Sequence, residues 1–226
     1  MPVGSLFNRV DAQAKVTGKA RYTDDLTMLG MRFAKYVRSP IAHGKVKRID
    51  ISKAVAYPGV DAVFTYEDVP GFFFPTAGHA HSLDPAKLDV ADRYLLTSHV
   101  RHQGDAVAIV VARDQLTAEQ AVELVEVEYD ELPVITTAEQ ALAEDAYPLH
   151  PGGNLLKQHS IVTGDLERAF AESDLVLEGD YHTPIHQHCH METVISYAYM
   201  EKEDHIIIVS STQIPHIVRR VVATSL

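Results

Sequence analysis

The feature that most restricts the fold of this chain is a nearly continuous apolar run, A-V-A-I-V-V-A, at residues 106–112. A run of this length, rich in β-branched residues and preceded by a Gly-Asp turn, predicts a strand that is buried on both faces. A helix is expected to follow over residues 114–124, with an apolar stripe and a capping box formed by Thr117 and Gln120. The pattern then changes to alternation over residues 125–129, which predicts another strand. This order predicts an α+β domain.

Three upstream stretches have the composition and partial alternation of strands, and they cover residues 31–38, 45–51 and 60–65. Short helices are expected over residues 52–57 and 137–143, and the second would be capped by Thr137 with Gln140. Between these elements lies a loop-like stretch that contains three adjacent phenylalanines, Phe72 to Phe74. They are expected to pack against another domain or chain, or else to fold onto the core of their own domain.

The best candidate for a linker is E-D-A-Y-P-L-H-P-G-G-N, at residues 144–154, which holds two prolines and two glycines and has no periodicity. We therefore predict a first domain at residues 1–143 and a second at residues 155–226. Fold class is predicted as α+β for both domains.

The second domain is expected to contain strands at 155–162 and 175–181, a helix after Asp165, and an antiparallel pair formed by residues 193–200 and 206–210. A final helix is expected to begin at Pro215, with an apolar face that nothing later in the chain could cover. About 70 residues are also few for a closed core. We therefore expect this domain to be completed by further polypeptide.

Composition excludes several classes of function. The chain of 226 residues has a formal net charge of -11, which disfavours nucleic acid as a partner because phosphate binding needs clustered Lys and Arg. One cysteine cannot form an internal disulfide or hold an iron–sulfur cluster, and it fits a reducing compartment. No signal-peptide core and no run of about 18 apolar residues is present, so no membrane partner and a cytoplasmic location are expected.

The densest group of chemically useful side chains lies at residues 180–215. His186, His188 and His190 alternate, so an extended segment would place all three on one face. Such a face can hold Zn or Fe if Cys189, Glu192 or water completes the coordination. This spacing does not match a known metal-binding motif. We therefore favour the alternative that these histidines line a polar cleft or bond to the backbone.

The other motifs in the chain carry weaker signals. In an extended strand, Cys189 would point away from the neighbouring histidines. We therefore expect Cys189 to be a small buried hydrophobic residue and not a nucleophile. Phosphate-loop and G-x-G-x-x-G motifs are absent from the sequence. Gln213 follows an expected strand and precedes the helix that begins at Pro215, where an amide could donate to an oxo group or an anion.

Taken together, several segments resemble the N-terminal part of the molybdenum-binding subunit in the xanthine dehydrogenase/aldehyde oxidase family. Those that carry the resemblance span nearly the whole chain: V-T-G-K-A-R-Y-T-D-D at 16–25, V-R-S-P-I-A-H-G-K-V at 37–46, P-G-V-D-A-V-F-T at 58–65, H-Q-G-D-A-V-A-I-V-V-A at 102–112, A-E-Q-A at 118–121, V-E-Y-D-E-L-P at 127–133, Q-H-C-H-M-E-T at 187–193 and S-S-T-Q-I-P at 210–215. The resemblance implies an a/b hammerhead domain followed by an incomplete α+β molybdopterin-binding domain.

The same resemblance implies a cofactor and one site residue. The cofactor is molybdenum-molybdopterin, expected in the cytosine dinucleotide form. The glutamine of the family's S-T-Q motif falls on Gln213, which would donate a hydrogen bond to an oxo ligand of molybdenum from the second coordination shell. The family's G-G-F-G motif, its substrate-orienting arginine and its catalytic glutamate are not present, so no catalytic residue is assigned to this segment.

By resemblance, the function is hydroxylation of purines such as hypoxanthine or xanthine with oxygen derived from water. Electrons would pass to [2Fe–2S] clusters and FAD in partner subunits, and this segment would be inactive without the remainder of the molybdenum subunit. A related hydroxylase acting on an aldehyde or another N-heterocycle is one alternative. A metal-dependent hydrolase or metal-binding module using the histidine face is another, although only His205 and His216 remain after Glu192 as further histidine ligands. A purely structural assembly module is a third.

Overall fold

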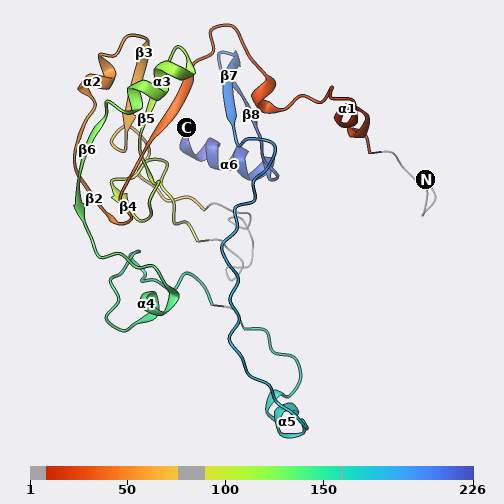
Figure 1. The fold of residues 1–226 in the computed structure, drawn as a ribbon. Helices are drawn as coiled ribbons and strands as arrows, with labels where there is room; N and C mark the ends of the chain where they lie inside the picture. Colours follow the sequence, from red (N-terminus) through yellow and green to blue (C-terminus); the bar gives the residue numbers. More distant parts are fainter. Residues whose placement is uncertain (1–8, 76–89, 159) are drawn as a thin grey trace. The chain divides into compact units, whose positions relative to one another are not determined.

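The computed structural model describes residues 9–75, 90–158 and 160–226 (Figure 1). The chain divides into two compact units. The first consists of Met1–Leu132 together with Met191–Leu226, and the second is Pro133–His190. Most of the predicted loop around Pro85 falls at residues 76–89, outside the described residues. The predicted domain boundary at 144–154 stays a prediction.

The apolar run at residues 106–112 forms the central strand of the first sheet. This sheet has the order β1 (Phe33–Arg38), β5 (Ala106–Ala112), β3 (Val60–Thr65), and both pairings are antiparallel. Because β5 has a neighbour on each side, its backbone groups are satisfied while apolar side chains emerge on both faces. Val107 and Val110 occupy opposite faces of the strand, and both are fully buried. The predicted buried strand is confirmed.

A second antiparallel sheet has the order β4 (His99–Val100), β2 (Gly44–Asp50), β6 (Glu126–Glu131). In this sheet β2 is central, and Gly44 lies opposite Glu131 and Val100. The strand β4 has only two residues and was not predicted from the sequence, because so short a segment shows no alternation. The predicted strands at 45–51 and 125–129 are confirmed with shifted ends.

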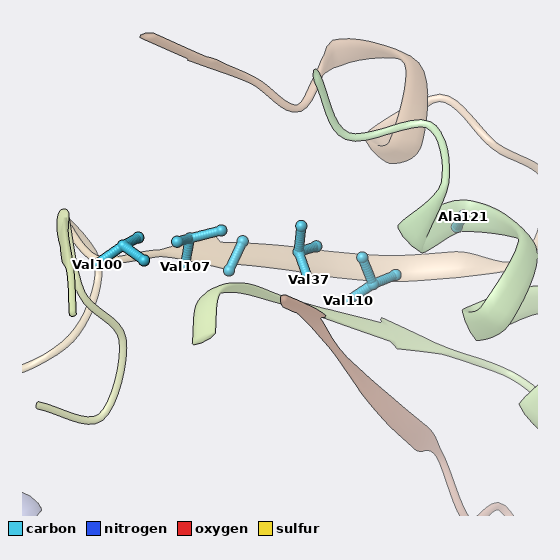
Figure 2. Packing of buried hydrophobic residues seen from close by; sticks show 6 residues of the cluster. Val37, Val100, Val107, Val110 and Ala121 are labelled. Carbon is cyan, nitrogen blue, oxygen red and sulfur yellow. The ribbon is translucent and has the colours of Figure 1, made fainter. Parts of the chain in front are cut away.

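The hydrophobic core includes residues of the first sheet, of helix α3 (Gln115–Val122) and of β4, and side chains of β2 and β6 pack against it. Figure 2 shows Val37, Val107 and Val110 along the strands, with Ala121 approaching from α3. The helix is present as predicted, but the capping box of Thr117 with Gln120 is wrong. Asp114 is the N-cap, and its side chain accepts from the backbone N–H of Thr117 at 2.8 Å. A carboxylate at this earlier position takes the capping role directly.

The remaining short elements are helical: α1 (Ala12–Val16), a 3-10 helix (Thr23–Asp25), α2 (Ser52–Val55), α4 (Ala138–Leu142) and α5 (Leu166–Ala171). Both predicted caps in the second unit are present. The Thr137 hydroxyl accepts from the backbone N–H of Gln140 at 3.2 Å, and Asp165 accepts from that of Arg168 at 3.0 Å. Local capping chemistry therefore predicts where these helices begin.

The end of the first unit forms a hairpin followed by a helix. Strands β7 (Ser196–Lys202) and β8 (His205–Ser210) pair in antiparallel fashion, and α6 (Pro215–Ser225) begins at the predicted proline. The predicted antiparallel pair and final helix are confirmed. No described helix has the length and apolar character needed to cross a membrane.

The second unit departs most from the sequence prediction. No strand forms at 155–162 or 175–181 among the described residues, although both stretches were predicted as strands. An apolar pattern makes a strand possible, but a strand also needs a hydrogen-bonded neighbour. These stretches remain exposed, as illustrated by Ile161 at 94% and Leu177 at 85%. The two predicted strands are therefore wrong for this chain by itself.

Candidate functional site

Residues 211–213 connect β8 to α6, and Ser211 fixes the start of this connection. The backbone N–H of Ile195 donates to the Ser211 hydroxyl at 3.0 Å, and the backbone N–H of Ser211 donates to the Ile195 carbonyl at 3.1 Å. The hydroxyl also donates to that same carbonyl at 3.1 Å. These bonds extend the hairpin by one pair beyond its last strand residues. The connection thus begins from a defined position.

Gln213 is the side chain in this connection that is left available for a ligand. The Thr212 hydroxyl accepts from the backbone N–H of Ile214 at 3.1 Å, so it is used locally. Gln213 is exposed, and none of the hydrogen bonds between described residues uses its side chain. It precedes the N-terminus of α6, where Pro215 is the first helical residue and Ile214 provides no side-chain cap. A helix N-terminus carries partial positive charge, so this position suits an acceptor atom or an anion.

The opening segment of the chain reaches the same region through Thr193. The Thr193 hydroxyl donates to Asp24 Oδ2 at 3.2 Å, although the two residues are 169 positions apart. Asp24 lies in the short 3-10 helix, in which Thr23 is buried and Asp25 accepts from the backbone N–H of Tyr22 at 2.8 Å. Thr193 and Asp24, which belong to two different family segments, are therefore in contact within the first unit. This contact was not predicted from the sequence.

The histidine segment belongs to the second unit and does not form a strand. Cys189 has φ of +50°, a left-handed conformation that interrupts the extended backbone required for regular alternation. The rings of His188 and His190 still stack, with centroids 5.3 Å apart. Among the described residues, no group of three or more His, Cys, Asp or Glu is placed to hold a metal ion. A metal role for His186, His188 and His190 stays a prediction.

Two other residues of this stretch are exposed. The expectation that Cys189 is a small buried hydrophobe is wrong, because it lies in a segment without a sheet or helix to cover it. Glu192 is also exposed and lies in the first unit. The described structure thus gives neither residue a defined chemical environment.

A buried polar cluster around His43 was not predicted from the sequence. His43 is 2% exposed, and its Nε2 atom lies 3.2 Å from Nε2 of His99, while Nδ1 of His99 lies 3.0 Å from an Arg101 Nη2 atom. Arginine can only donate, so His99 accepts at Nδ1 and donates from Nε2 to His43. This proton arrangement suits a structural link between β4 and the residue that precedes β2. His43 lies in the family segment at residues 37–46, but the sequence pattern gives no sign that its side chain is buried.

The described geometry defines an α+β protein whose first unit leads through a hairpin and a Ser-Thr-Gln connection into a helix. The structure is similar to the aldehyde oxidoreductase from Desulfovibrio gigas, with a TM-score of 0.79 and 34% identity, covering 92% of this chain and 23% of that one. It is equally similar to quinoline 2-oxidoreductase from Pseudomonas putida 86, with a TM-score of 0.79 and 31% identity, covering 98% of this chain and 28% of that one.

Residues 17–133 match the family "Aldehyde oxidase and xanthine dehydrogenase, a/b hammerhead domain", and residues 149–226 match the "Molybdopterin cofactor-binding domain". The chain belongs to the aldehyde oxidase and xanthine dehydrogenase family. The resemblance and the fold class predicted from the sequence are confirmed: an a/b hammerhead domain followed by part of a molybdopterin-binding domain.

Two relatives illustrate how much of such a protein this chain represents. It is 63% identical over 218 residues to the xanthine dehydrogenase molybdenum-binding subunit of Escherichia coli O157:H7, covering 96% of this chain and 29% of that protein. It is 30% identical over 225 residues to the xanthine dehydrogenase of Dictyostelium discoideum, covering 100% of this chain and 15% of that protein. The chain therefore spans less than a third of the length of these relatives.

Proposed function

We propose that this chain serves as the N-terminal part of the molybdenum-binding subunit of a hydroxylase. The observation that carries the proposal is the match to both families along one chain, together with 63% identity to a xanthine dehydrogenase molybdenum-binding subunit. Its first domain would act as scaffold and subunit interface. Its last 78 residues, the part that matches the molybdopterin cofactor-binding domain, would contribute one side of the cofactor site.

Gln213 is the residue that we assign to the cofactor. Its exposed amide takes part in no hydrogen bond between described residues, and it adjoins the uncapped N-terminus of α6, so the donor set fits an oxygen-rich, negatively charged group. The amide N–H would hold an oxo ligand of molybdenum and would orient the cofactor from the second shell. When bound, molybdenum-molybdopterin, which we expect in the cytosine dinucleotide form, would supply the oxygen-transfer and redox chemistry.

A purine such as hypoxanthine or xanthine is the proposed substrate class. Relatives named as xanthine dehydrogenases and as a probable hypoxanthine oxidase support this choice. Other N-heterocycles are an alternative substrate class. They are supported by a relative from Eubacterium barkeri named as a nicotinate dehydrogenase and by the structure of quinoline 2-oxidoreductase. Aldehydes are a second alternative, supported by the similar structure of an aldehyde oxidoreductase.

The proposed partners are the remainder of the molybdenum subunit, an Fe–S subunit and an FAD subunit. A single cysteine in 226 residues supports placing the [2Fe–2S] clusters in another polypeptide, since each cluster needs about four cysteine ligands. The chain spans 29% of its Escherichia coli relative, so we propose that it is inactive when produced alone. We propose a cytoplasmic location because the same cysteine usage suits a reducing compartment.

The test is to produce the chain alone and together with the part of the Escherichia coli relative outside the matched span. Molybdenum, pterin and hydroxylation of hypoxanthine, with an artificial electron acceptor, are expected only in the combined sample. Gln213→Ala should lower kcat by about 10-fold to 100-fold while molybdenum is retained, because the variant lacks one oriented hydrogen-bond donor to the cofactor. Gln103→Ala, an exposed glutamine with no described hydrogen bond, is the matched control. Hypoxanthine oxidation by the chain alone would contradict the proposal.

The histidine alternative is resolved by the same samples. Stoichiometric zinc or iron on the chain alone, lost when His186, His188 and His190 are replaced by alanine, would favour a metal-binding module. Nicotinate and benzaldehyde, tested beside hypoxanthine, distinguish the substrate classes. Faster turnover of either would retain the hydroxylase proposal and replace its substrate.

A further inference from the structure

A mostly apolar groove in the first unit has no role in the proposed cofactor site. One wall is the segment 72–75, which contains the three phenylalanines, and the other is a face of α6 formed by Ile217, Arg220, Val221 and Thr224. Its volume is about 180 Å³. Phe72 to Phe74 were predicted to pack against another domain or chain, or onto the core of their own domain, and both alternatives stay predictions. In the structure these residues face α6 across the groove.

The phenylalanine wall is held in place by contacts with Arg93 and Tyr94, in the part of the chain that is described again from residue 90. The backbone N–H of Phe74 donates to the Arg93 carbonyl at 2.9 Å, and the Arg93 N–H donates back at 3.2 Å. The ring of Phe73 lies 4.1 Å from the ring of Tyr94, measured between centroids. Two backbone hydrogen bonds and an aromatic contact fix this wall, so the groove does not depend on side chains alone.

The helix wall has the spacing of one helical face, since its residues occupy positions i, i+3, i+4 and i+7. The Thr224 hydroxyl donates to the carbonyl of Arg220 at 2.9 Å, so its donor is already used. Arg220 Nε is buried and has no hydrogen-bond partner among the described residues. Arg219, the preceding residue in the helix, is exposed and does not line the groove.

This combination specifies the chemistry of an occupant. Arg220 brings the cationic guanidinium group to the groove wall, and carboxylates are the best-matched partners of a guanidinium group. The phenylalanines and the two aliphatic side chains favour an apolar group beside that carboxylate. A cavity of about 150 Å³ accommodates a benzene-sized group, so the groove suits one or two side chains and is too small for a pterin dinucleotide.

We infer that the groove receives an acidic side chain and a neighbouring apolar side chain from the polypeptide that completes the molybdenum subunit. This inference rests on the proposed function. A polypeptide is favoured over a free ligand because the chain spans only 29% of its Escherichia coli relative, which leaves most of such a subunit to supply the occupant. The carboxylate pairs with Arg220 and the apolar side chain packs between α6 and segment 72–75. This joins the hammerhead domain to the molybdopterin-binding domain.

The experiment measures how much of the remaining Escherichia coli subunit is retained by tagged versions of this chain after co-production. Arg220→Met keeps an unbranched stem as far as the position of Nε and removes the charged end, and it should lower retention by about 10-fold or more. Arg220→Lys keeps the charge without the fork-shaped donor set and should lower retention less. Arg219→Met is the matched control and should stay within about two-fold of the unmodified chain, as expected for an exposed cation. Circular dichroism melting of each variant reports whether the fold is intact.

The possible outcomes separate the inference from the proposed function. If the unmodified chain retains none of the remainder, the proposed function fails and the inference fails with it. If Arg220→Met retains as much as the unmodified chain, the inference is overturned and the proposed function stands. A dimer of the chain that disappears only in Arg220→Met would also overturn it, because the occupant would then be a second copy. If Arg220→Met is unfolded, Arg220→Gln, which keeps a polar side chain and removes the charge, decides the inference, and retention equal to that of the unmodified chain overturns it.

Discussion

The region around β5 and the segment 155–190 both contain many apolar residues, but only the first buries them. Val107 and Val110 are fully buried, whereas Ile185 is 103% exposed and Leu175 is 73% exposed. Among the described residues, no buried side chain lies after Ala121. The difference does not follow from local hydrophobicity. It follows from whether two strands and a helix are present to cover each apolar side chain.

This contrast teaches which part of the chain can be stable without further polypeptide. Full burial of a Val, Leu or Ile side chain contributes about 1.5–3 kcal/mol, and segment 155–190 gains almost none of this in the described structure. Soluble proteins rarely leave many large apolar side chains in water unless a partner covers them. The segment is therefore the part of the chain whose structure depends most on a partner, as the proposed function requires.

The largest expected effect is a difference in hydrogen exchange between these two regions. Amides of β5 should be protected by about 10³-fold or more, since their opening requires unfolding of the core. Amides of residues 175–190 should exchange within about 10-fold of the rate in an unstructured peptide, because no strand or helix forms there. Hydrogen exchange with mass spectrometry on the chain alone measures both. Equal protection would remove the basis of the comparison.

The same hydrogen-exchange measurement can be repeated after adding the remainder of the Escherichia coli subunit. Protection of residues 175–190 is then expected to rise while that of β5 changes little. An unchanged profile in a sample where the two polypeptides co-purify would show that another surface forms the contact.

The sequence predicted the region around β5 well and the segment 155–190 poorly. The strand at 106–112 was found because burial on both faces requires a continuous apolar run, and the sheet that satisfies this requirement lies in the same chain. The stretches 155–162 and 175–181 carry an equally readable apolar pattern but lack a paired strand. A pattern reports what a segment can do, and pairing depends on the rest of the polypeptide.

The candidate site was predicted only in part. Gln213 came from a family resemblance, and its helix N-terminus came from the proline at 215, which the structure places as predicted. Contacts between distant residues escaped prediction. Thr193 bonds to Asp24 across 169 positions, and His43 meets His99 through a strand of two residues, too short to show periodicity.

The next expected effect concerns close backbone packing in the region that buries its core. A Cβ added at Gly44 would lie 2.8 Å from the backbone oxygen of Asp130 and 2.5 Å from Ile41 Cδ1. The side-chain carbon can move, but the backbone oxygen belongs to β6, which pairs with β2. Gly44→Ala is therefore expected to destabilise the first unit by about 1–3 kcal/mol. Urea unfolding followed by circular dichroism measures this change.

Gly71→Ala is the matched control, because a Cβ there would have nothing within 4 Å and its φ is not positive. It should change the free energy of unfolding by less than about 0.5 kcal/mol. Equal effects from the two substitutions would show that the approach of β2 to β6 at Gly44 is not tight.

The smallest expected effect compares two helices that have the same cap. Asp114 and Asp165 each accept a hydrogen bond from the backbone N–H three residues later, but α3 packs in the core whereas α5 has no buried residue. Asp114→Ala should lower the Tm of the first unit by about 2–4 °C, the shift typical of a lost cap. Asp165→Ala should leave that Tm unchanged and reduce only the local helicity of α5. A similar loss of Tm in both variants would mean that α5 takes part in the cooperative core.

The effect of the Asp114 substitution should also depend on pH. Hydrogen bonds from Thr117, and then the nearby Arg113, lower the pKa of Asp114 below its usual value in the folded chain. The unfolded chain therefore binds this proton more readily. The contribution of the carboxylate is fully present above the unfolded pKa of about 3.9 and is lost as the pH falls through the folded pKa. Thermal melts at pH 7 and pH 3.5 should show a smaller difference between the unmodified chain and Asp114→Ala at the lower pH. A difference that grows on acidification would show that the carboxylate does not stabilise α3 in its charged form.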